Sequence, residues 1–144
     1  IAYAGQSRED RIALIRQEMA EKKADWFVLT SLDDIAWLLN FRGNDVQDNP
    51  VVLAYLMMSA GSLRLYTNAA DFKEADRKTL ENAGVEFFEY NGIYEDVAKL
   101  TENQTVIYDG SALNYAILDS MPESAKKVDE QNLTLLPKAR TQWK

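Results

Sequence analysis

Hydrophobic positions at the start of the chain recur with the spacing of a helix. Ser7 and Asp10 have the arrangement of a capping box, in which each side chain accepts a hydrogen bond from the other residue's backbone N–H. Apolar residues then follow every three or four positions, at Ile12, Ile15 and Met19. This pattern predicts an amphipathic helix with one buried face.

A short apolar run and a second capped segment come next. Residues 26–30 are apolar and rich in side chains that favour strands, which indicates a buried strand. Ser31, with Asp34 three residues later, repeats the pattern of a helix start. The apolar positions behind it predict a short helix that ends near Asn40.

Two strands joined by a turn are expected in the middle of the chain. Residues 51–58 form a long apolar run, and residues 59–62 have the composition of a tight turn. In the run 63–67, Arg64 and Tyr66 alternate with Leu and Thr, the period of a strand with one exposed face. The two runs are expected to pair as a hairpin.

The rest of the chain continues to alternate between helices and strands. Asn68 is placed to cap a helix that Gly84 would close, because Gly tolerates the left-handed conformation after a last turn. Further expected elements are a strand over 85–90, a short helix over 93–100, a strand over 105–108, a helix over 112–120 and an edge strand over 126–129. This order predicts an α/β domain with a mixed sheet flanked by helices.

The length suits one domain. A chain of 144 residues buries roughly 68–70% of its unfolded surface, so it needs no disulfide or metal to fold. We expect residues 1–6 to be the tail of a preceding domain or a linker, residues 7–136 to form the domain, and residues 137–144 to lead to a further domain.

The composition closes most routes to catalysis. The chain contains no Cys and no His, which removes thiol nucleophiles, thiolate metal sites, imidazole bases and His-ligated metals. A carboxylate-only site for Mg²⁺ or Ca²⁺ stays open in principle, but no DxDxDG loop is present. We therefore expect no catalytic residue, metal or cofactor in this chain.

Charge and hydropathy limit the partners. The net charge is −7 and the basic residues are scattered, so a nucleic-acid partner is not expected. No apolar stretch approaches the ~20 residues of a membrane-spanning helix, and no signal peptide is recognisable at the start. The lack of Cys agrees with a reducing cytoplasm.

The most distinctive polar segment lies between the second helix and the next strand. Residues 40–50 contain three Asn, two Asp, one Arg, one Gly and one Pro. Arg42 offers a planar fork of donors for a carboxylate or a peptide oxygen, and Asp45 could hold that fork or bind an amine. A solvated connection is the commoner reason for such a composition, but loops on a rigid scaffold often carry function.

Other candidates for chemistry are weaker. Asp33 and Asp34 could act as a metal or acid–base pair, although acidic residues in a first helical turn usually complement the helix dipole. Trp26 is expected in the core, Trp37 in the core or at the surface, and Trp143 against a surface beyond this chain.

The segment 31–50, SLDDIAWLLNFRGNDVQDNP, strongly resembles a segment of the long, three-domain Xaa-Pro aminopeptidases. Residues 3–7 resemble that family's junction into its second domain, and residues 109–118 and 136–140 fit its later part. The resemblance covers essentially the whole chain.

This resemblance implies a creatinase/prolidase N-terminal domain with a topology related to ribonuclease H. The parent enzyme would remove an N-terminal residue that precedes proline, using two divalent metals, usually manganese, in a C-terminal pita-bread domain. This chain would be a non-catalytic domain, inactive alone, that partners the catalytic domain and short peptides with proline second. The resemblance also allows a homodimer and a cytoplasmic location.

In that family, the residues that match Arg42 and Asp45 lie towards the active-site cleft. The resemblance therefore implies that these two residues contact substrate in the intact parent, and that the domain shapes and gates the site and supports assembly. Two other readings stay open. One is a protein-interaction module from a catalytically inactive relative, and the other is the N-terminal domain of a prolidase or creatinase, against which the segment 37–43 argues.

Overall fold

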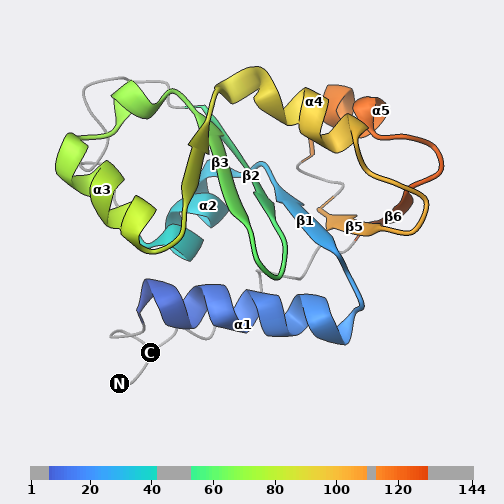
Figure 1. Ribbon diagram of the computed structural model, residues 1–144, viewed down its shortest axis with the longest axis horizontal. Helices are drawn as coiled ribbons and strands as arrows, with labels where there is room; N and C mark the ends of the chain where they lie inside the picture. The colour runs from blue at the N-terminus through green and yellow to red at the C-terminus, as the bar shows by residue number, and fades with distance from the viewer. Residues whose placement is uncertain (1–6, 42–52, 110–112, 130–144) are drawn as a thin grey trace.

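The computed structural model describes residues 7–41, 53–109 and 113–129 (Figure 1). Helices and strands alternate along these ranges in the predicted order. The elements are α1 (Arg8–Glu21), β1 (Trp26–Leu29), α2 (Leu32–Leu39), β2 (Ala54–Met58), β3 (Leu63–Thr67), η3 (Ala69–Asp71), α3 (Glu74–Asn82), β4 (Glu86–Phe88), η4 (Tyr90–Gly92), α4 (Ile93–Ala98), β5 (Thr105–Tyr108), α5 (Tyr115–Ser120) and β6 (Lys126–Asp129).

The strands form a mixed sheet with the order β4-β3-β2-β1-β5-β6. β2 pairs antiparallel with both of its neighbours, and all other neighbouring strands are parallel. β2 and β3 form the predicted hairpin, in which Leu56 lies opposite Leu65. Because β2 alone is reversed, its first residue lies at the same edge of the sheet as the carboxyl ends of the other strands. This edge is called the carboxyl edge below.

Both faces of the sheet are covered, each by its own set of helices (Figure 1). Side chains of β2 alternate, so that Leu56 and Met58 join one core while Tyr55 and Met57 join the other. The first core receives Ile12, Ile15 and Met19 from α1, Ile35 and Leu38 from α2 and Leu80 from α3. The second receives Ile93 and Val97 from α4 and Ile117 from α5.

The predicted caps at Ser7, Ser31 and Gly84 are confirmed. Ser7 Oγ accepts a hydrogen bond from the Asp10 backbone N–H at 3.1 Å, and the reciprocal bond to the Asp10 carboxylate completes the capping box. Ser31 Oγ accepts from the Asp34 N–H at 3.4 Å at the start of α2. Gly84 follows α3 with a φ of 100°, the left-handed conformation that favours glycine.

The helix predicted behind Asn68 is divided in two. Asn68 Oδ1 accepts from the Ala70 N–H at 3.2 Å and caps only the short turn η3, while α3 begins later, at Glu74. Between them Phe72 is extended, with φ −101° and ψ 143°, and its ring is buried edge-on to Phe41 at 5.3 Å. Burial of this aromatic ring interrupts the helix.

The prediction that β3 has one exposed face is wrong. The Tyr66 side chain is fully buried, because α4 packs over that face. Its hydroxyl donates a hydrogen bond to Asp96 Oδ2 at 2.5 Å, and Arg64 forms an ion pair with the same oxygen at 3.4 Å. Tyr66 alternates with apolar residues and was therefore expected at the surface. Instead α4 covers it and supplies Asp96 as its hydrogen-bond partner.

Two further boundaries differ from the prediction. β4 ends at Phe88, before the predicted end at residue 90, because Tyr90 already starts the turn η4. α5 begins at Tyr115 rather than at residue 112, with Asn114 as its capping residue. The edge strand β6 lies where it was predicted, beside β5.

We predict that Tyr66→Phe lowers the free energy of unfolding by about 1–3 kcal/mol, the range for a hydrogen bond to a charged group. Urea denaturation followed by circular dichroism measures this change. Tyr115→Phe is the matched control, because the Tyr115 side chain is 77% exposed. An equal loss in both variants would contradict the role given to Asp96.

The same contact predicts a dependence on alkaline pH. Burial, reinforced by the hydrogen bond to Asp96, raises the pKa of Tyr66 above its ordinary value of 10.0. Above pH 10 the unfolded chain releases this proton while the folded chain keeps it, so stability falls as pH rises. Tyr66→Phe should make this decline shallower between pH 9.5 and about 11. A variant that declines as steeply as the parent would refute the assignment.

Candidate functional site

The two predicted substrate contacts, Arg42 and Asp45, lie outside the described residues, so their placement stays a prediction. The residues on either side of that segment are described. Phe41 follows the end of α2, and Leu53 precedes β2 at the carboxyl edge.

The end of α2 is held by two arginines of α1. Arg8 donates through Nε to the carbonyl of Leu39 and through Nη2 to the carbonyl of Asn40 at 3.1 Å. Arg11 donates to the carbonyl of Trp37 at 2.6 Å. The last carbonyls of a helix lack N–H partners within it, so the guanidinium groups supply donors there. The Trp37 carbonyl also accepts from the Asn40 N–H at 3.2 Å. The cations also lie favourably at the negative end of the helix dipole.

The backbone after α2 is equally well determined. Asn40 adopts the left-handed conformation with φ 55°, and the Phe41 N–H donates to the Ala36 carbonyl at 3.1 Å. The buried Phe41 ring then packs edge-on against Phe72. The chain therefore enters residue 42 from a point fixed by a cap, two arginines and a buried ring.

The weaker candidates have structural roles. Asp33 and Asp34 lie in the first turn of α2, where they complement the dipole as expected. Trp37 is buried, with the Arg11 guanidinium 5.1 Å from its ring centroid, and Trp26 is half-buried beneath Arg64. Trp143 lies outside the described residues.

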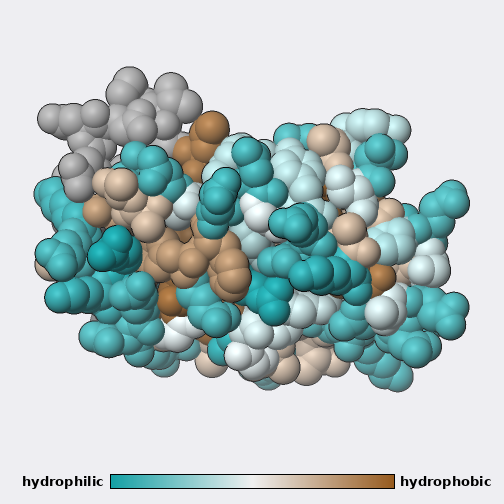
Figure 2. All heavy atoms as spheres, turned by 45° about the horizontal axis from the view of Figure 1, so that its top comes forward, coloured by the Kyte–Doolittle hydropathy of each residue, from teal (hydrophilic) through white to brown (hydrophobic). Residues whose placement is uncertain are grey.

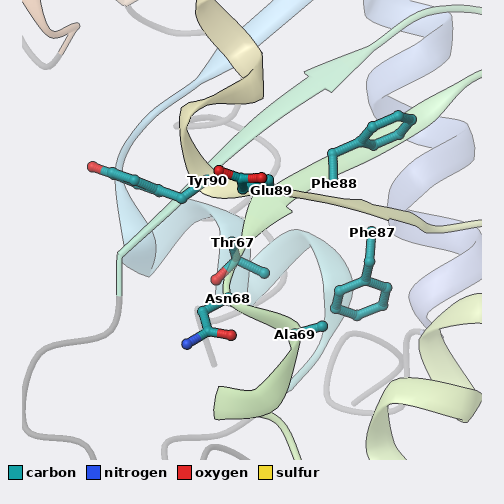
Figure 3. A pocket seen from close by; sticks show the side chains of 7 residues that line it. All are labelled: Thr67, Asn68, Ala69, Phe87, Phe88, Glu89 and Tyr90. Atoms are coloured by element: carbon teal, nitrogen blue, oxygen red, sulfur yellow. The ribbon is translucent and has the colours of Figure 1, made fainter.

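Two neighbouring hollows open at the carboxyl edge. The first, of about 380 Å³, is lined by Thr30, Leu32, Leu53, Ala54, Tyr55, Tyr90 and Asn114. The second, of about 310 Å³, is lined by Thr67, Asn68, Ala69, Phe87, Phe88, Glu89 and Tyr90 (Figure 3). Tyr90 lines both, so its side chain lies at the boundary between them.

Several large apolar side chains at this edge stay exposed and are not buried in either core. Leu32, Leu53 and Phe88 are among the large hydrophobic residues that stay exposed, and each lines one of the hollows. Figure 2, which brings the top of Figure 1 forward, shows apolar side chains gathered among hydrophilic ones on this side. A surface of this mixed character suits binding.

Two stacked tyrosines form the polar centre of the first hollow. The rings of Tyr55 and Tyr90 are 4.7 Å apart at an angle of 17°, and the Tyr90 hydroxyl donates to the Tyr55 hydroxyl at 2.7 Å. Asn114 Nδ2 also donates to the Tyr55 hydroxyl, at 3.3 Å. Burial, with the hydrogen bond to Tyr55, raises the pKa of Tyr90. The Tyr90 hydroxyl therefore keeps its proton well above neutral pH.

The hollows are suited to binding rather than to acid–base chemistry. The one charged side chain among their lining residues is the exposed Glu89. Across the described ranges, no three His, Cys, Asp or Glu residues come together as a metal site would require. No local sequence pattern marks these hollows, because their residues come from separate strands and loops.

No helix in the described part of the chain is long and apolar enough to cross a membrane.

Comparison with known proteins places these features in a wider group. Residues 1–142 match the family described as Creatinase/Prolidase N-terminal domain. Two relatives, from Laccaria bicolor and Ajellomyces dermatitidis, are each named "Probable Xaa-Pro aminopeptidase P" and are 37% identical over 113 and 112 residues. These matches cover 78% of this chain but only 17% and 18% of the relatives.

Solved structures show the same fold. X-prolyl aminopeptidase from Caenorhabditis elegans, described as a cytosolic enzyme with a di-nuclear active site, has a TM-score of 0.76 and 26% identity. The match covers 90% of this chain and 22% of that one. Aminopeptidase P from Streptococcus thermophilus, with a TM-score of 0.65 and 14% identity, matches 91% of this chain and 98% of its own. At that identity the likeness concerns the fold alone.

We predict that Arg11→Ala destabilises the domain by about 1–3 kcal/mol, because it removes a charged hydrogen bond to α2 and the contact with the Trp37 ring. Chemical denaturation measures the change. Gln17→Ala, at an exposed position of the same helix, is the control and should stay within about 0.5 kcal/mol of the parent. A neutral Arg11→Ala would show that Arg11 does not help to hold the end of α2.

Proposed function

Because the chain belongs to the creatinase/prolidase N-terminal domain family, we propose that it is the non-catalytic domain of an Xaa-Pro aminopeptidase. In this proposal it shapes and gates the substrate site of the parent enzyme and supports its assembly. The observation that carries the proposal is the 37% identity to two relatives named as Xaa-Pro aminopeptidases. That identity also favours such a parent over a prolidase or creatinase.

The hydrolytic centre is proposed to lie in another domain of the parent. The described residues do not fit a dinuclear site, since the chain contains no His and its described acidic residues form no cluster of three. We therefore assign the two divalent metals, manganese by the family resemblance, to the catalytic pita-bread domain. The partners proposed for this chain are that domain and short peptides with proline second. By analogy with the Caenorhabditis elegans enzyme, we place the parent in the cytoplasm.

Arg42 and Asp45 are the proposed substrate contacts. The Arg42 guanidinium would orient a peptide carbonyl or carboxylate, and Asp45 would either steady that guanidinium or bind an amine. Support comes from the flank of the segment, where α1 and Phe72 fix the backbone of Asn40 and Phe41. A rigid point of departure lowers the entropy lost when the following side chains order around a substrate.

We predict that Arg42→Ala in the intact parent enzyme lowers kcat/KM for an X-Pro peptide by about 1–3 kcal/mol, the range for a charged hydrogen bond. Arg42→Lys should recover only part of this loss, because Lys keeps the charge but lacks the planar fork. Lys78→Ala, at an exposed position on α3, is the control and should leave kcat/KM unchanged. An unchanged value in Arg42→Ala would remove Arg42 from the substrate site.

A double-mutant cycle tests the role of Asp45. If Asp45 steadies the Arg42 guanidinium, the losses in kcat/KM caused by Asp45→Asn and Arg42→Ala should be non-additive by at least 0.5 kcal/mol or so. If Asp45 instead binds the substrate amine independently, the two losses should add.

A further inference from the structure

Asn91 is the one asparagine in the chain that is followed by a glycine, Gly92. Asparagine is a chemically labile residue. It loses its side-chain amide when the backbone nitrogen of the next residue attacks the side-chain carbonyl carbon. Glycine hinders this attack least, because it has no Cβ. The two residues lie in η4, just before α4 begins at Ile93.

The reaction needs no partner except water. The Gly92 nitrogen forms a bond to Asn91 Cγ, and the side-chain nitrogen leaves as ammonia and carries away the proton of the Gly92 N–H. Water then opens the five-membered succinimide ring at either of its carbonyl carbons. One product is aspartate. The other is isoaspartate, in which the backbone runs through the former side chain.

The Asn91 side chain is exposed, so water reaches its amide. Asn82 provides an internal comparison, because it is also exposed but is followed by Ala83. The Ala83 Cβ hinders the attacking nitrogen, which the Gly92 backbone does not do. The sequence therefore makes Asn91 the more reactive of these two asparagines.

The fold opposes the reaction at the attacking nitrogen. The Gly92 N–H donates a hydrogen bond to the Glu89 carbonyl at 2.9 Å, and this bond must break before the nitrogen can release its proton. The turn also holds the backbone in the helical range. The succinimide ring closes only after the backbone between Asn91 and Gly92 rotates out of that range.

Contacts on both sides of the dipeptide resist this rotation. On one side the Tyr90 ring stacks on Tyr55 at 4.7 Å, and its hydroxyl donates to the Tyr55 hydroxyl at 2.7 Å. On the other side Ile93 is fully buried in the second core. Ring closure therefore requires a local opening of the structure around η4.

We propose that Asn91 is a site of spontaneous deamidation, and that η4 restrains the reaction until this turn opens. Conversion to isoaspartate lengthens the backbone between Tyr90 and Ile93, so the turn cannot close again with both residues in their places. Because Tyr90 lines both hollows, conversion changes the carboxyl edge. This modification goes beyond the peptidase function and does not depend on it.

The test compares the folded chain with the same chain in guanidinium chloride, at one temperature and one mildly alkaline pH. Trypsin releases residues 79–99, which contain Asn82 and Asn91, as a single peptide. Mass spectrometry of its fragments measures conversion at each asparagine, because replacement of NH₂ by OH changes the mass.

In guanidinium chloride, Asn91 should convert about tenfold faster than Asn82 or more, since only Asn91 precedes a residue without a Cβ. In the folded chain, Asn91 should convert about tenfold more slowly than in the denaturant or less, which corresponds to an opening free energy of at least about 1.4 kcal/mol. Equal rates at the two asparagines in the denaturant, or equal rates at Asn91 in the folded and unfolded chains, would overturn the proposal.

Gly92→Ala tests the attack by the backbone nitrogen. Gly92 has φ −63°, which any residue adopts, and an added Cβ would lie 3.7 Å from the nearest atom of the Tyr66 ring, an ordinary contact. The variant should therefore fold and should convert about tenfold more slowly in guanidinium chloride. An unchanged rate would contradict attack by this nitrogen.

Tyr90→Ala tests the restraint by the turn. Loss of the contact with Tyr55 should raise the rate at Asn91 in the folded chain about threefold or more and leave the rate in guanidinium chloride unchanged. Val128→Ala, at an exposed position on β6, is the control and should change neither rate. If Tyr90→Ala does not fold, Tyr90→Phe keeps the ring and should give a smaller increase. A folded-state rate equal to that of the parent would contradict the restraint.

Discussion

One reversed strand determines how the whole domain is arranged. β2 lies antiparallel between β1 and β3 in a sheet whose other neighbours are parallel, and all five of its side chains are buried. Its backbone must therefore be paired on both sides, because unpaired N–H and C=O groups are costly away from water. Since β2 enters the sheet at the carboxyl edge, Leu53 lies at the edge where the parallel strands end. The first hollow, which Leu53, Ala54 and Tyr55 help to line, depends on this reversal.

Around that edge the fold combines rigid support with exposed polar groups. Arg8 and Arg11 hold the end of α2. Asn68 caps η3, the turn that follows β3. Asn114 does two things at once, since its carbonyl oxygen caps α5 and its Nδ2 donates to the Tyr55 hydroxyl. The chain contains no imidazole and no thiol group, and the proposed function gives this edge a role in peptide recognition through shape and hydrogen bonds.

Local patterns predicted much of this fold because the interactions behind them are local. The caps at Ser7 and Ser31 and the left-handed Gly84 each depend on residues within one turn, and the structure confirms them. The break at Phe72 in the helix predicted behind Asn68, and the burial of Tyr66, were missed because distant elements decide both. The partner of the Tyr66 hydroxyl lies thirty residues away on α4, where no periodicity within β3 could reveal it.

The two hollows could not be predicted either, because their residues are also far apart in the sequence. Tyr55 meets Tyr90 across 35 residues and Asn114 across 59 residues of sequence, so only the strand order brings them together. Arg42 and Asp45 were proposed from the resemblance of one segment to a family, and their role stays a prediction. Family membership was predicted correctly from the segment 31–50, because residues 1–142 match the family.

The central claim is that this chain contributes recognition while another domain supplies the hydrolytic centre. A peptidase assay on the purified 144-residue chain, with X-Pro peptides and added Mn²⁺, tests it most directly when the intact parent is measured alongside. The account predicts turnover by the parent and none above background by the chain alone. Metal-dependent cleavage by the chain alone would contradict it.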